Sequence, residues 1–342
     1  MKADFDFVIY SESEAGHRGS YIKFISTIAR IKRLERKDLF GASKPVFFLM
    51  IEESFALFVF VALIRSALGR RTAGLLFRPL PVISGSNIRL RFKYQILKLL
   101  KLFPKIQVLT ILPFSVEPRF SEIADGWIYD FQLWDLSVNE RKIVSNQCET
   151  AAARKWLFLN SNLNDDKKPL ICAIGSQNRQ KGFDVFAGTL VNNASIQQNF
   201  YFAFGGKVSD LYNFELNGFE SVGGIAINRR VSDAELLDLY SSADIIWCYY
   251  SFDYDQASGV FGRAVQLGIP AIVREDSLIH KFCIKEDIDH IALGRNIEEV
   301  LLSTNINRNE HKGEELSKRF ALISIKSLER ALDVTFDAEG SK

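Results

Sequence analysis

The segment from Val231 to Arg274 constrains the fold more than any other part of the sequence. It opens with Ser232-Asp-Ala-Glu235, the S-x-x-E form of a helix capping box, and apolar residues follow at helical spacing. The apolar run between Asp244 and Ser251 is rich in Ile, Trp and Tyr, which predicts a strand covered by helices on both faces. A serine and two glycines in 256–262 then open a second helix, which ends at Gly268 before a strand at 271–273. This order makes a βαβ unit, and the N-terminus of its second helix offers free backbone N–H groups to a phosphate.

A second block, upstream of this unit, begins with an apolar strand that ends at Gly175 and continues as Ser-Gln-Asn-Arg-Gln-Lys181-Gly-Phe-Asp184. Together the two blocks resemble the C-terminal domain of GT-B glycosyltransferases, in particular the large retaining group 1 that includes sucrose- and glycogen-synthase relatives. The resemblance covers the chain from about Pro169 to Val273. It implies an α/β protein of two Rossmann-like domains with a cleft between them. It also implies a hexosyltransferase-type enzyme that needs no metal and no cofactor besides its nucleotide-sugar donor.

The same resemblance implies roles for individual residues in binding the donor. When a sugar leaves its nucleotide, negative charge accumulates on the diphosphate, so cations and N–H donors must lie close to it. Lys181 is implied as the catalytic cation; its structural alternative is a solvated lysine at the start of a helix. In relatives the base of the nucleotide passes the segment that corresponds to 225–227, so Ile225 and Ile227 are implied as its contacts. The other implied donor contacts are Gly175, Ser176, Arg179, Ser258, Gly259 and Val260.

The sequence departs from the family pattern at three positions. Family members carry two glutamates eight positions apart, and counting back from the A-x-x-x-G-x-P segment puts them at Asp255 and Arg263. Arg263 cannot accept hydrogen bonds from ribose hydroxyls, so we expect it to contact a phosphate or a carboxylate. Asp255 is expected to hold a sugar hydroxyl as a catalytic residue, or else to be an exposed loop carboxylate. Ser176 stands where the family has an arginine, and Arg179 is the candidate to replace that charge.

The loop after the first predicted strand, 5–10, contains two glycines, a histidine and an arginine. Open α/β sheets form their ligand crevice at the carboxyl ends of the strands. His17 is therefore a candidate catalytic residue that donates to a phosphate or to the acceptor, and Gly16 and Arg18 are candidate donor-binding residues. The alternative for His17 is a solvent-exposed or capping group. The other histidines show no metal-ligand spacing, so no metal site is predicted.

Alternating strand and helix patterns extend through the N-terminal half, which predicts a second parallel sheet with helices on both faces. Helical spacing predicts helices over 21–34 and 54–68, and the segment 219–222 is expected to be a strand leading to the base. The polar, turn-rich segment 160–168 is the expected hinge. The predicted domains are 1–165 for the acceptor, 166–310 for the nucleotide sugar, and a C-terminal helix over 311–342 that packs back on the first domain.

Charge is unevenly distributed along the chain. The net charge is +2, yet the residues from Ser54 to Val116 include ten Lys or Arg and no Asp or Glu. Within them, 88–105 mixes six basic residues with Leu, Ile and Phe, a composition suited to an amphipathic helix on an anionic membrane. The alternative is a surface helix whose apolar side faces the core. No nucleic-acid-binding motif accompanies the charge, so a nucleic-acid partner is not predicted.

Composition narrows the class of protein further. With 342 residues and 47% hydrophobic residues, the chain is long enough for two packed domains. The four cysteines show no C-x-x-C spacing, which is typical of reduced thiols in the cytoplasm. The first residues enter a strand directly and carry three acids, so a cleavable signal is not expected. The expected location is the cytoplasm, peripheral to the inner face of the cell membrane.

Three functions are compatible with these patterns. The first is a glycosyltransferase that uses a nucleotide-sugar donor and a lipid-linked or polysaccharide acceptor at the cytoplasmic membrane face. The second is another GT-B-shaped transferase or epimerase that keeps the phosphate site and changes the ribose contact. The third, suggested by Arg263 and Ser176, is a catalytically weakened subunit that binds a nucleotide sugar. Donor hydrolysis without acceptor separates the first from the third.

Overall fold

The computed structural model describes residues 5–13, 17–159, 161, 167–256 and 258–336. The chain divides into two compact units, of which the first is Met1–Phe131 with Arg319–Lys342 and the second is Gln132–Lys318. Each unit contains a six-stranded sheet in which all the strand pairs are parallel. The prediction of an α/β protein with two Rossmann-like domains is therefore confirmed.

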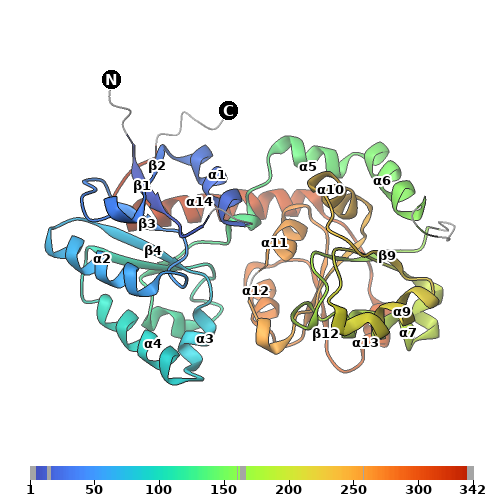
Figure 1. The fold of residues 1–342 in the computed structure, drawn as a ribbon. Coiled ribbons are helices and arrows are strands. Elements are labelled where there is room, and N and C mark those ends of the chain that lie inside the picture. The colour runs from blue at the N-terminus through green and yellow to red at the C-terminus, as the bar shows by residue number, and fades with distance from the viewer. Residues whose placement is uncertain (1–4, 14–16, 160, 162–166, 257, 337–342) are drawn as a thin grey trace. The chain divides into compact units, whose positions relative to one another are not determined.

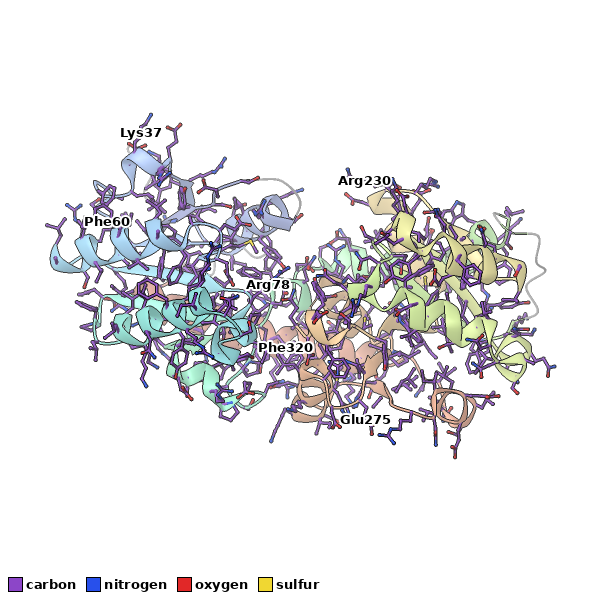
Figure 2. The ribbon with its side chains drawn as sticks, turned by 60° about the horizontal axis from the view of Figure 1, so that its bottom comes forward. Lys37, Phe60, Arg78, Arg230, Glu275 and Phe320 are labelled. Atoms are coloured by element: carbon purple, nitrogen blue, oxygen red, sulfur yellow. The ribbon has the colours of Figure 1, made fainter. Side chains whose placement is uncertain are left out.

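The first unit has the strand order β2-β1-β3-β4-β5-β6. Its strands are β1 (Phe7–Tyr10), β2 (Ile31–Arg33), β3 (Val46–Phe48), β4 (Thr72–Leu76), β5 (Ile106–Thr110) and β6 (Gly126–Trp127). Its helices are α1 (His17–Ile28), α2 (Phe55–Ala67), α3 (Pro79–Ser84) and α4 (Ile88–Leu100), with short 3-10 turns η1 (Arg36–Asp38) and η2 (Pro118–Glu122). Figure 1 shows α2, α3 and α4 on one side of this sheet. On the side of α2 that faces solvent, Phe60 is 59% exposed (Figure 2).

The helix predicted over 21–34 ends earlier than expected. The α1 helix stops at Ile28, and Ile31–Arg33 form the edge strand β2, whose Ile31 pairs with Phe7 of β1. Asp6 fixes the turn between α1 and β2, because its carboxylate accepts hydrogen bonds from the backbone N–H and the guanidinium of Arg30. Tertiary pairing with β1 therefore overrides the helical spacing of the apolar residues.

The second unit has the strand order β12-β11-β10-β7-β8-β9. Its strands are β7 (Leu170–Ile174), β8 (Tyr201–Gly205), β9 (Ile225–Ile227), β10 (Ile245–Cys248), β11 (Ala271–Arg274) and β12 (His290–Leu293). Its helices are α5 (Val138–Ser145), α6 (Gln147–Leu159), α7 (Phe183–Val191), α8 (Ala194–Asn199), α9 (Asn213–Ser221), α10 (Asp233–Ser242), α11 (Gly259–Gln266), α12 (Leu278–Glu286) and α13 (Ile297–Ser303). Short 3-10 turns are η4 (Arg179–Lys181), η5 (Asp210–Tyr212) and η6 (Phe252–Tyr254), while η3 (Phe131–Leu133) and α14 (Glu310–Leu332) continue from one unit into the other.

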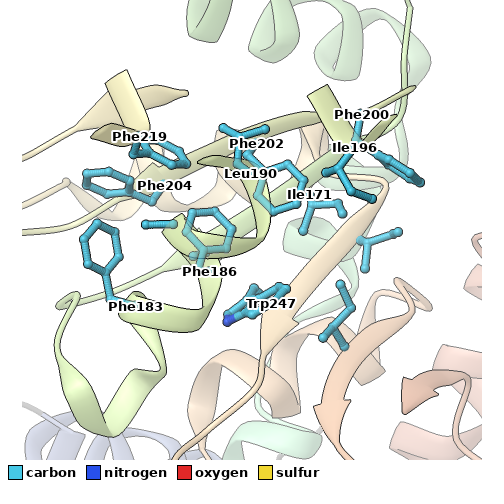
Figure 3. Packing of buried hydrophobic residues seen from close by; sticks show 14 of the residues in the cluster. Ile171, Phe183, Phe186, Leu190, Ile196, Phe200, Phe202, Phe204, Phe219 and Trp247 are labelled. Atoms are coloured by element: carbon cyan, nitrogen blue, oxygen red, sulfur yellow. The ribbon is translucent and has the colours of Figure 1, made fainter. Parts of the chain in front are cut away.

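An aromatic cluster forms the core on one face of the second sheet (Figure 3). The ring of Phe186 on α7 lies 5.1 Å from that of Phe202 and 5.2 Å from that of Trp247, measured between centroids. Phe219 belongs to the same cluster and is fully buried. The prediction of a strand at 219–222 was wrong, because Phe219 is instead one of two core-facing residues of helix α9, with Leu216. The cluster fixes α7, and with it the turn that leads into this helix.

The boundary between the two units differs from the predicted boundary at residue 165. Helices α5 and α6 belong to the second unit because both pack on α10. The Ser241 hydroxyl of α10 donates to the Val144 carbonyl of α5 and lies 3.1 Å from the Thr150 hydroxyl of α6, and Arg154 of α6 pairs with Asp244, just after α10. The expected hinge at 160–168 therefore lies inside the second unit, and Asn160 and 162–166 lie outside the described residues.

The end of the chain belongs to the first unit. The Ser324 hydroxyl of α14 accepts a hydrogen bond from the backbone N–H of Tyr129. The ring of Phe336 lies 5.8 Å from that of Phe7 on β1. The division within α14 falls at Lys318, not at residue 310.

Candidate functional site

The turn from β7 into α7 is locked against the end of β10. Gly182 has a φ of +68°, and a Cβ at this position would lie 2.1 Å from the carbonyl oxygen of Tyr249. Only glycine fits both requirements. The backbone N–H of Ser251 donates to the Gln180 carbonyl, and the Asn178 side chain accepts from the Lys181 N–H. These contacts fix the backbone from which the Lys181 side chain projects.

The Lys181 ammonium lies in an aromatic corner next to the start of α11. Its Nζ is 4.2 Å from the centroid of the Tyr250 ring, 5.0 Å from that of Tyr254, and 3.4 Å from the Ser258 hydroxyl. Burial lowers the pKa of Lys181 to about 8, so the group still carries its charge at neutral pH. No carboxylate pairs with it among the described residues. An unpaired cation held by π faces and a hydroxyl suits an anionic ligand.

Ser258 connects this cation to α11. It is 7% exposed, its hydroxyl contacts both the Lys181 ammonium and the Tyr250 hydroxyl, and its carbonyl accepts from the Gly262 N–H. Gly259 and Val260 are the first two residues of the helix, so their backbone N–H groups have no partner within the helix itself. The structure therefore brings together Lys181 and the predicted phosphate-binding amides.

The glycines of α11 make close contacts with another part of the protein. A Cβ on Gly259 would lie 1.8 Å from the Oε1 of Gln132, and one on Gly262 would lie 2.5 Å from the Gln132 carbonyl oxygen. Both glycines thus allow the helix to pack on the segment that begins at Gln132. A substitution at Gly259 must displace this side chain, besides any effect on a ligand.

Gly175 lies at the carboxyl end of β7 and faces open space. Its φ is +92°, and no atom lies within 4 Å of a Cβ built there. Its carbonyl accepts from the Gln177 amide and lies so close to Gly206 that a Cβ on Gly206 would be 2.0 Å away. The backbone is therefore held from one side and open on the other. The next two predicted contacts, Ser176 and Arg179, are exposed at the same turn.

Asp255 has its partners within the protein. Its carboxylate lies 3.2 Å from the Arg274 guanidinium and accepts the backbone N–H of Leu278, at the start of α12. Burial raises the pKa of Asp255, and these two partners oppose that shift. Arg274 also donates to the Tyr250 carbonyl and lies 3.8 Å from the centroid of the Phe252 ring. Asp255 is thus neither an exposed loop carboxylate nor a free group: it anchors the loop that carries the two tyrosines.

Arg263 faces the segment that follows Gln132. Its guanidinium lies 3.5 Å from the Asp135 carboxylate, which also accepts a hydrogen bond from Gln266. Burial raises the pKa of Asp135, and the adjacent arginine opposes this. Arg263 was expected to contact a phosphate or a carboxylate. The protein itself provides the carboxylate, that of Asp135.

The remaining predicted residues that the structure describes belong to β9 and to α1. Ile225 and Ile227 are buried in β9, 1% and 6% exposed, so both residues belong to the core and neither is open to a base. In the first unit, Arg18 pairs with Glu53. His17 is the first residue of α1, its side chain is outside the described part of the structure, and Gly16 lies outside the described residues.

Several residues of the site were not predicted. Tyr250, Tyr254 and Arg274 shape the environment of Lys181, and Asp135 neutralises Arg263. Two signals were available in the sequence: the run of aromatic residues at 249–254, and a charged residue at the end of the apolar strand 271–274. Each marks the carboxyl end of a parallel strand, where ligand sites form.

The described residues contain no group of three or more His, Cys, Asp or Glu side chains arranged to hold a metal ion. In the same residues, no helix is both long and apolar enough to cross a bilayer.

No family model matches the chain, and no curated protein matches it. Several solved structures match the chain in fold. The catalytic domain of starch synthase IV from Arabidopsis thaliana, bound to ADP and acarbose, is 11% identical with a TM-score of 0.57; the match covers 84% of this chain and 72% of that one. An alpha,alpha-trehalose-phosphate synthase (UDP-forming) from Burkholderia xenovorans, in complex with glucose-6-phosphate, is 10% identical with a TM-score of 0.53, covering 84% and 72%. The corresponding synthase from Burkholderia vietnamiensis is 10% identical with a TM-score of 0.52, covering 86% and 72%.

At this level of identity the likeness shows the fold. The chain has the fold of these GT-B synthases, as the two sequence blocks predicted. The match spans most of both chains, so it includes strands of both sheets and not the second unit alone.

Proposed function

We propose that the protein is a glycosyltransferase that moves a sugar from a nucleotide-sugar donor to a glycan acceptor. The observation that carries this proposal is the Lys181 ammonium, which has no carboxylate partner in the described structure and lies beside Ser258 at the start of α11. Proteins with the same fold were solved with ADP, or are described as UDP-forming, which supports a nucleotide donor.

The chemistry that this site favours is loss of a diphosphate. The acceptor hydroxyl oxygen forms a bond to the anomeric carbon while the bond from that carbon to the phosphate oxygen breaks. The bonding electrons leave with the nucleoside diphosphate, and the hydroxyl proton passes to a base or to the departing phosphate. In this proposal Lys181, Arg179 and the amides of Ser258, Gly259 and Val260 stabilise the charge on the diphosphate. No metal ion and no cofactor is given a part in it.

The open face of Gly175 is where the phosphates would approach most closely, because nothing lies within 4 Å of a Cβ built there. Ser176 is exposed at the same turn and would add a hydroxyl. His17, with Gly16 and Arg18, is proposed to act at the acceptor side or on the phosphates. Arg18 already pairs with Glu53, so a phosphate would have to compete with that carboxylate.

For the acceptor we propose a lipid-linked or polysaccharide glycan, and for the location the cytoplasmic face of the membrane, to which the protein binds peripherally. The exposed basic residues between Ser54 and Val116 support this part of the proposal: Arg78, Arg89, Arg91 and Lys98.

A second candidate is a subunit that binds a nucleotide sugar but turns it over weakly. It is favoured by one observation: both positions that match the family's glutamates are engaged in ion pairs, Asp255 with Arg274 and Arg263 with Asp135. Neither group is free to hold a sugar or ribose hydroxyl in this arrangement.

A panel of uridine, adenosine and guanosine diphosphate sugars tests both candidates. Thermal stabilisation measures binding, and release of the nucleoside diphosphate without acceptor measures donor hydrolysis. A glycosyltransferase shows both. Its hydrolysis falls in Lys181→Ala and is unchanged in Lys285→Ala, because Lys285 is an exposed residue of α12. Binding without hydrolysis supports the second candidate, and the absence of binding to every donor contradicts both.

A further inference from the structure

Helix α4 carries apolar side chains on two of its sides. Leu97 and Leu100 are buried, which is the core-facing side expected for a surface helix. A second set of apolar side chains is exposed: Ile88 (78%), Phe92 (66%), Leu99 (59%) and Leu102 (75%), the last of these in the turn after the helix. Steps of four, seven and three residues keep this set on one side of a helix. We call these four residues the α4 stripe.

The surface around the stripe is hollowed and apolar. A shallow groove of about 460 Å³ is lined by Ile88, Arg89, Arg91, Phe92 and Gln95. Single exposed apolar residues are ordinary on a protein surface, but a row of them beside a groove marks an interaction surface.

The basic residues of α4 differ in what they contact. Lys101 donates to the carbonyl oxygens of Ser121 and Ala124, so its charge is directed at the protein. Lys93 lies over the Phe55 ring and acts electrostatically on the buried Glu52 carboxyl, whereas Arg91 donates to the Gly85 carbonyl. Arg89 and Lys98 are exposed, and no side-chain partner is found for either within the described residues. The helix itself contains no acid, and the neighbouring Glu122 carboxylate accepts a hydrogen bond from the Tyr94 hydroxyl of α4.

We propose that the α4 stripe inserts into the interfacial layer of an anionic lipid bilayer while Arg89, Arg91 and Lys98 contact the head groups. An apolar row flanked by exposed cations is complementary to acyl chains beneath negative head groups. A second copy of this chain is a poor occupant, because pairing two stripes would bring like charges together. The proposal deepens the membrane location given under the proposed function and rests on it, but its test does not depend on glycosyl transfer.

The test uses the full chain and sedimentation with two kinds of vesicle: phosphatidylcholine alone, and equal parts of phosphatidylcholine and phosphatidylglycerol. The stripe variant is Phe92→Gln with Leu99→Gln. Its matched control is Leu211→Gln with Phe214→Gln, which changes two residues of the second unit that are 88% and 87% exposed. A charge variant, Arg89→Gln with Lys98→Gln, separates insertion from electrostatic attraction.

We expect wild type and control to bind anionic vesicles equally. The stripe variant should bind about tenfold more weakly or worse, and the charge variant should weaken binding as well, as does added salt. A fluorescent label on Phe92→Cys should report an apolar environment on binding; Cys148→Ser makes the labelling specific, because the other three cysteines are buried.

Three results would overturn the proposal: equal binding to both kinds of vesicle, wild-type binding by the stripe variant, or a dimer that the stripe variant dissociates while wild type ignores vesicles. Donor hydrolysis in solution by the stripe variant distinguishes the two proposals. If hydrolysis persists while vesicle binding is lost, docking and catalysis are separate; if wild type binds vesicles and hydrolyses no donor, only the proposed function fails.

Discussion

Gly182 and Tyr249 approach each other so closely that a Cβ on the glycine would lie 2.1 Å from the tyrosine carbonyl oxygen. This contact joins the turn before α7 to the end of β10 and thereby sets where Lys181 and Tyr250 meet. Gly175, at the start of the same turn, has a positive φ too but faces open space. Gly182 is therefore required by the packing of the protein, whereas Gly175 is open to a ligand.

We expect Gly182→Ala to destabilise the protein by about 3 kcal/mol or more, because backbone strain and overlap with a carbonyl act together. Gly175→Ala should cost only about 1 kcal/mol of strain, yet it should weaken nucleotide binding by placing a methyl group where the phosphates approach. Chemical denaturation and nucleotide titration of both variants measure the two effects. Wild-type nucleotide affinity in Gly175→Ala would show that the phosphates bind elsewhere.

Lys181 makes the site sensitive to pH. Burial lowers the pKa of its ammonium to about 8, so the free protein loses this charge as the pH rises through about 8. A bound diphosphate favours the charged form, so nucleotide binding above this pH should take up a proton and weaken as pH rises. Calorimetry in buffers of different ionisation enthalpy measures the uptake.

For Lys181→Ala we expect a loss of about 2–4 kcal/mol of transition-state stabilisation, seen as a fall in turnover with the fold retained. Lys181→Arg keeps its charge at every accessible pH and should flatten the pH profile of binding. Proton uptake by the Lys181→Ala variant equal to that of wild type would show that another group titrates.

The sequence predicted the backbone of this site better than its side-chain pairing. Periodicity and glycine spacing identify β7, β10, β11 and the two turns, because these depend on local patterns and on burial on both faces. The pairs Asp255–Arg274 and Arg263–Asp135 join residues that are 19 and 128 positions apart. Such pairing depends on how the strands are ordered in the sheet, and spacing along the chain does not determine that order.

The domain boundary was missed for a related reason. The polar segment 160–168 has the composition of a linker, but α5 and α6, which precede it, are held to α10: Val144 of α5 and Thr150 of α6 both contact Ser241. A loop between two elements of one unit and a linker between two units have the same composition. The α4 helix shows the opposite case: its two apolar sides are both present in the sequence, yet only burial separates the core side from the exposed one.

The pair Asp255–Arg274 should act on stability and on the position of the tyrosines. Arg274→Met leaves the Asp255 carboxylate buried without its ion-pair partner, which should cost about 3 kcal/mol of unfolding free energy. Adding Asp255→Asn should recover part of this loss, so a double-mutant cycle should give a coupling energy of the two side chains. A catalytic Asp255 predicts a different outcome: Asp255→Asn would then abolish turnover with no change in stability, and the cycle would show no coupling.

The last prediction concerns Glu52, in the loop after β3. One of its carboxyl oxygens accepts the backbone N–H of Arg78 at 2.6 Å, whereas the other is buried without a hydrogen-bond partner in the described residues. Burial raises the pKa of Glu52 above its ordinary value of 4.5, against the backbone N–H groups that oppose the shift. The folded state therefore holds this proton more tightly than the unfolded state does. As the pH rises from about 4.5 through the raised pKa, ionisation of Glu52 should lower the free energy of unfolding. This loss of stability remains at higher pH.

Glu52→Gln removes this ionisation but keeps an oxygen to accept the Arg78 N–H. We therefore expect the variant to gain stability relative to wild type as the pH rises, with little difference at the acid end. Glu53→Gln is the matched control, because Glu53 is the exposed partner of Arg18 and should lose stability on substitution rather than gain it. Denaturant unfolding of the three proteins at a series of pH values measures the differences. If the gap between wild type and Glu52→Gln is the same at every pH, Glu52 does not titrate differently in the folded state, and its buried oxygen must have a partner.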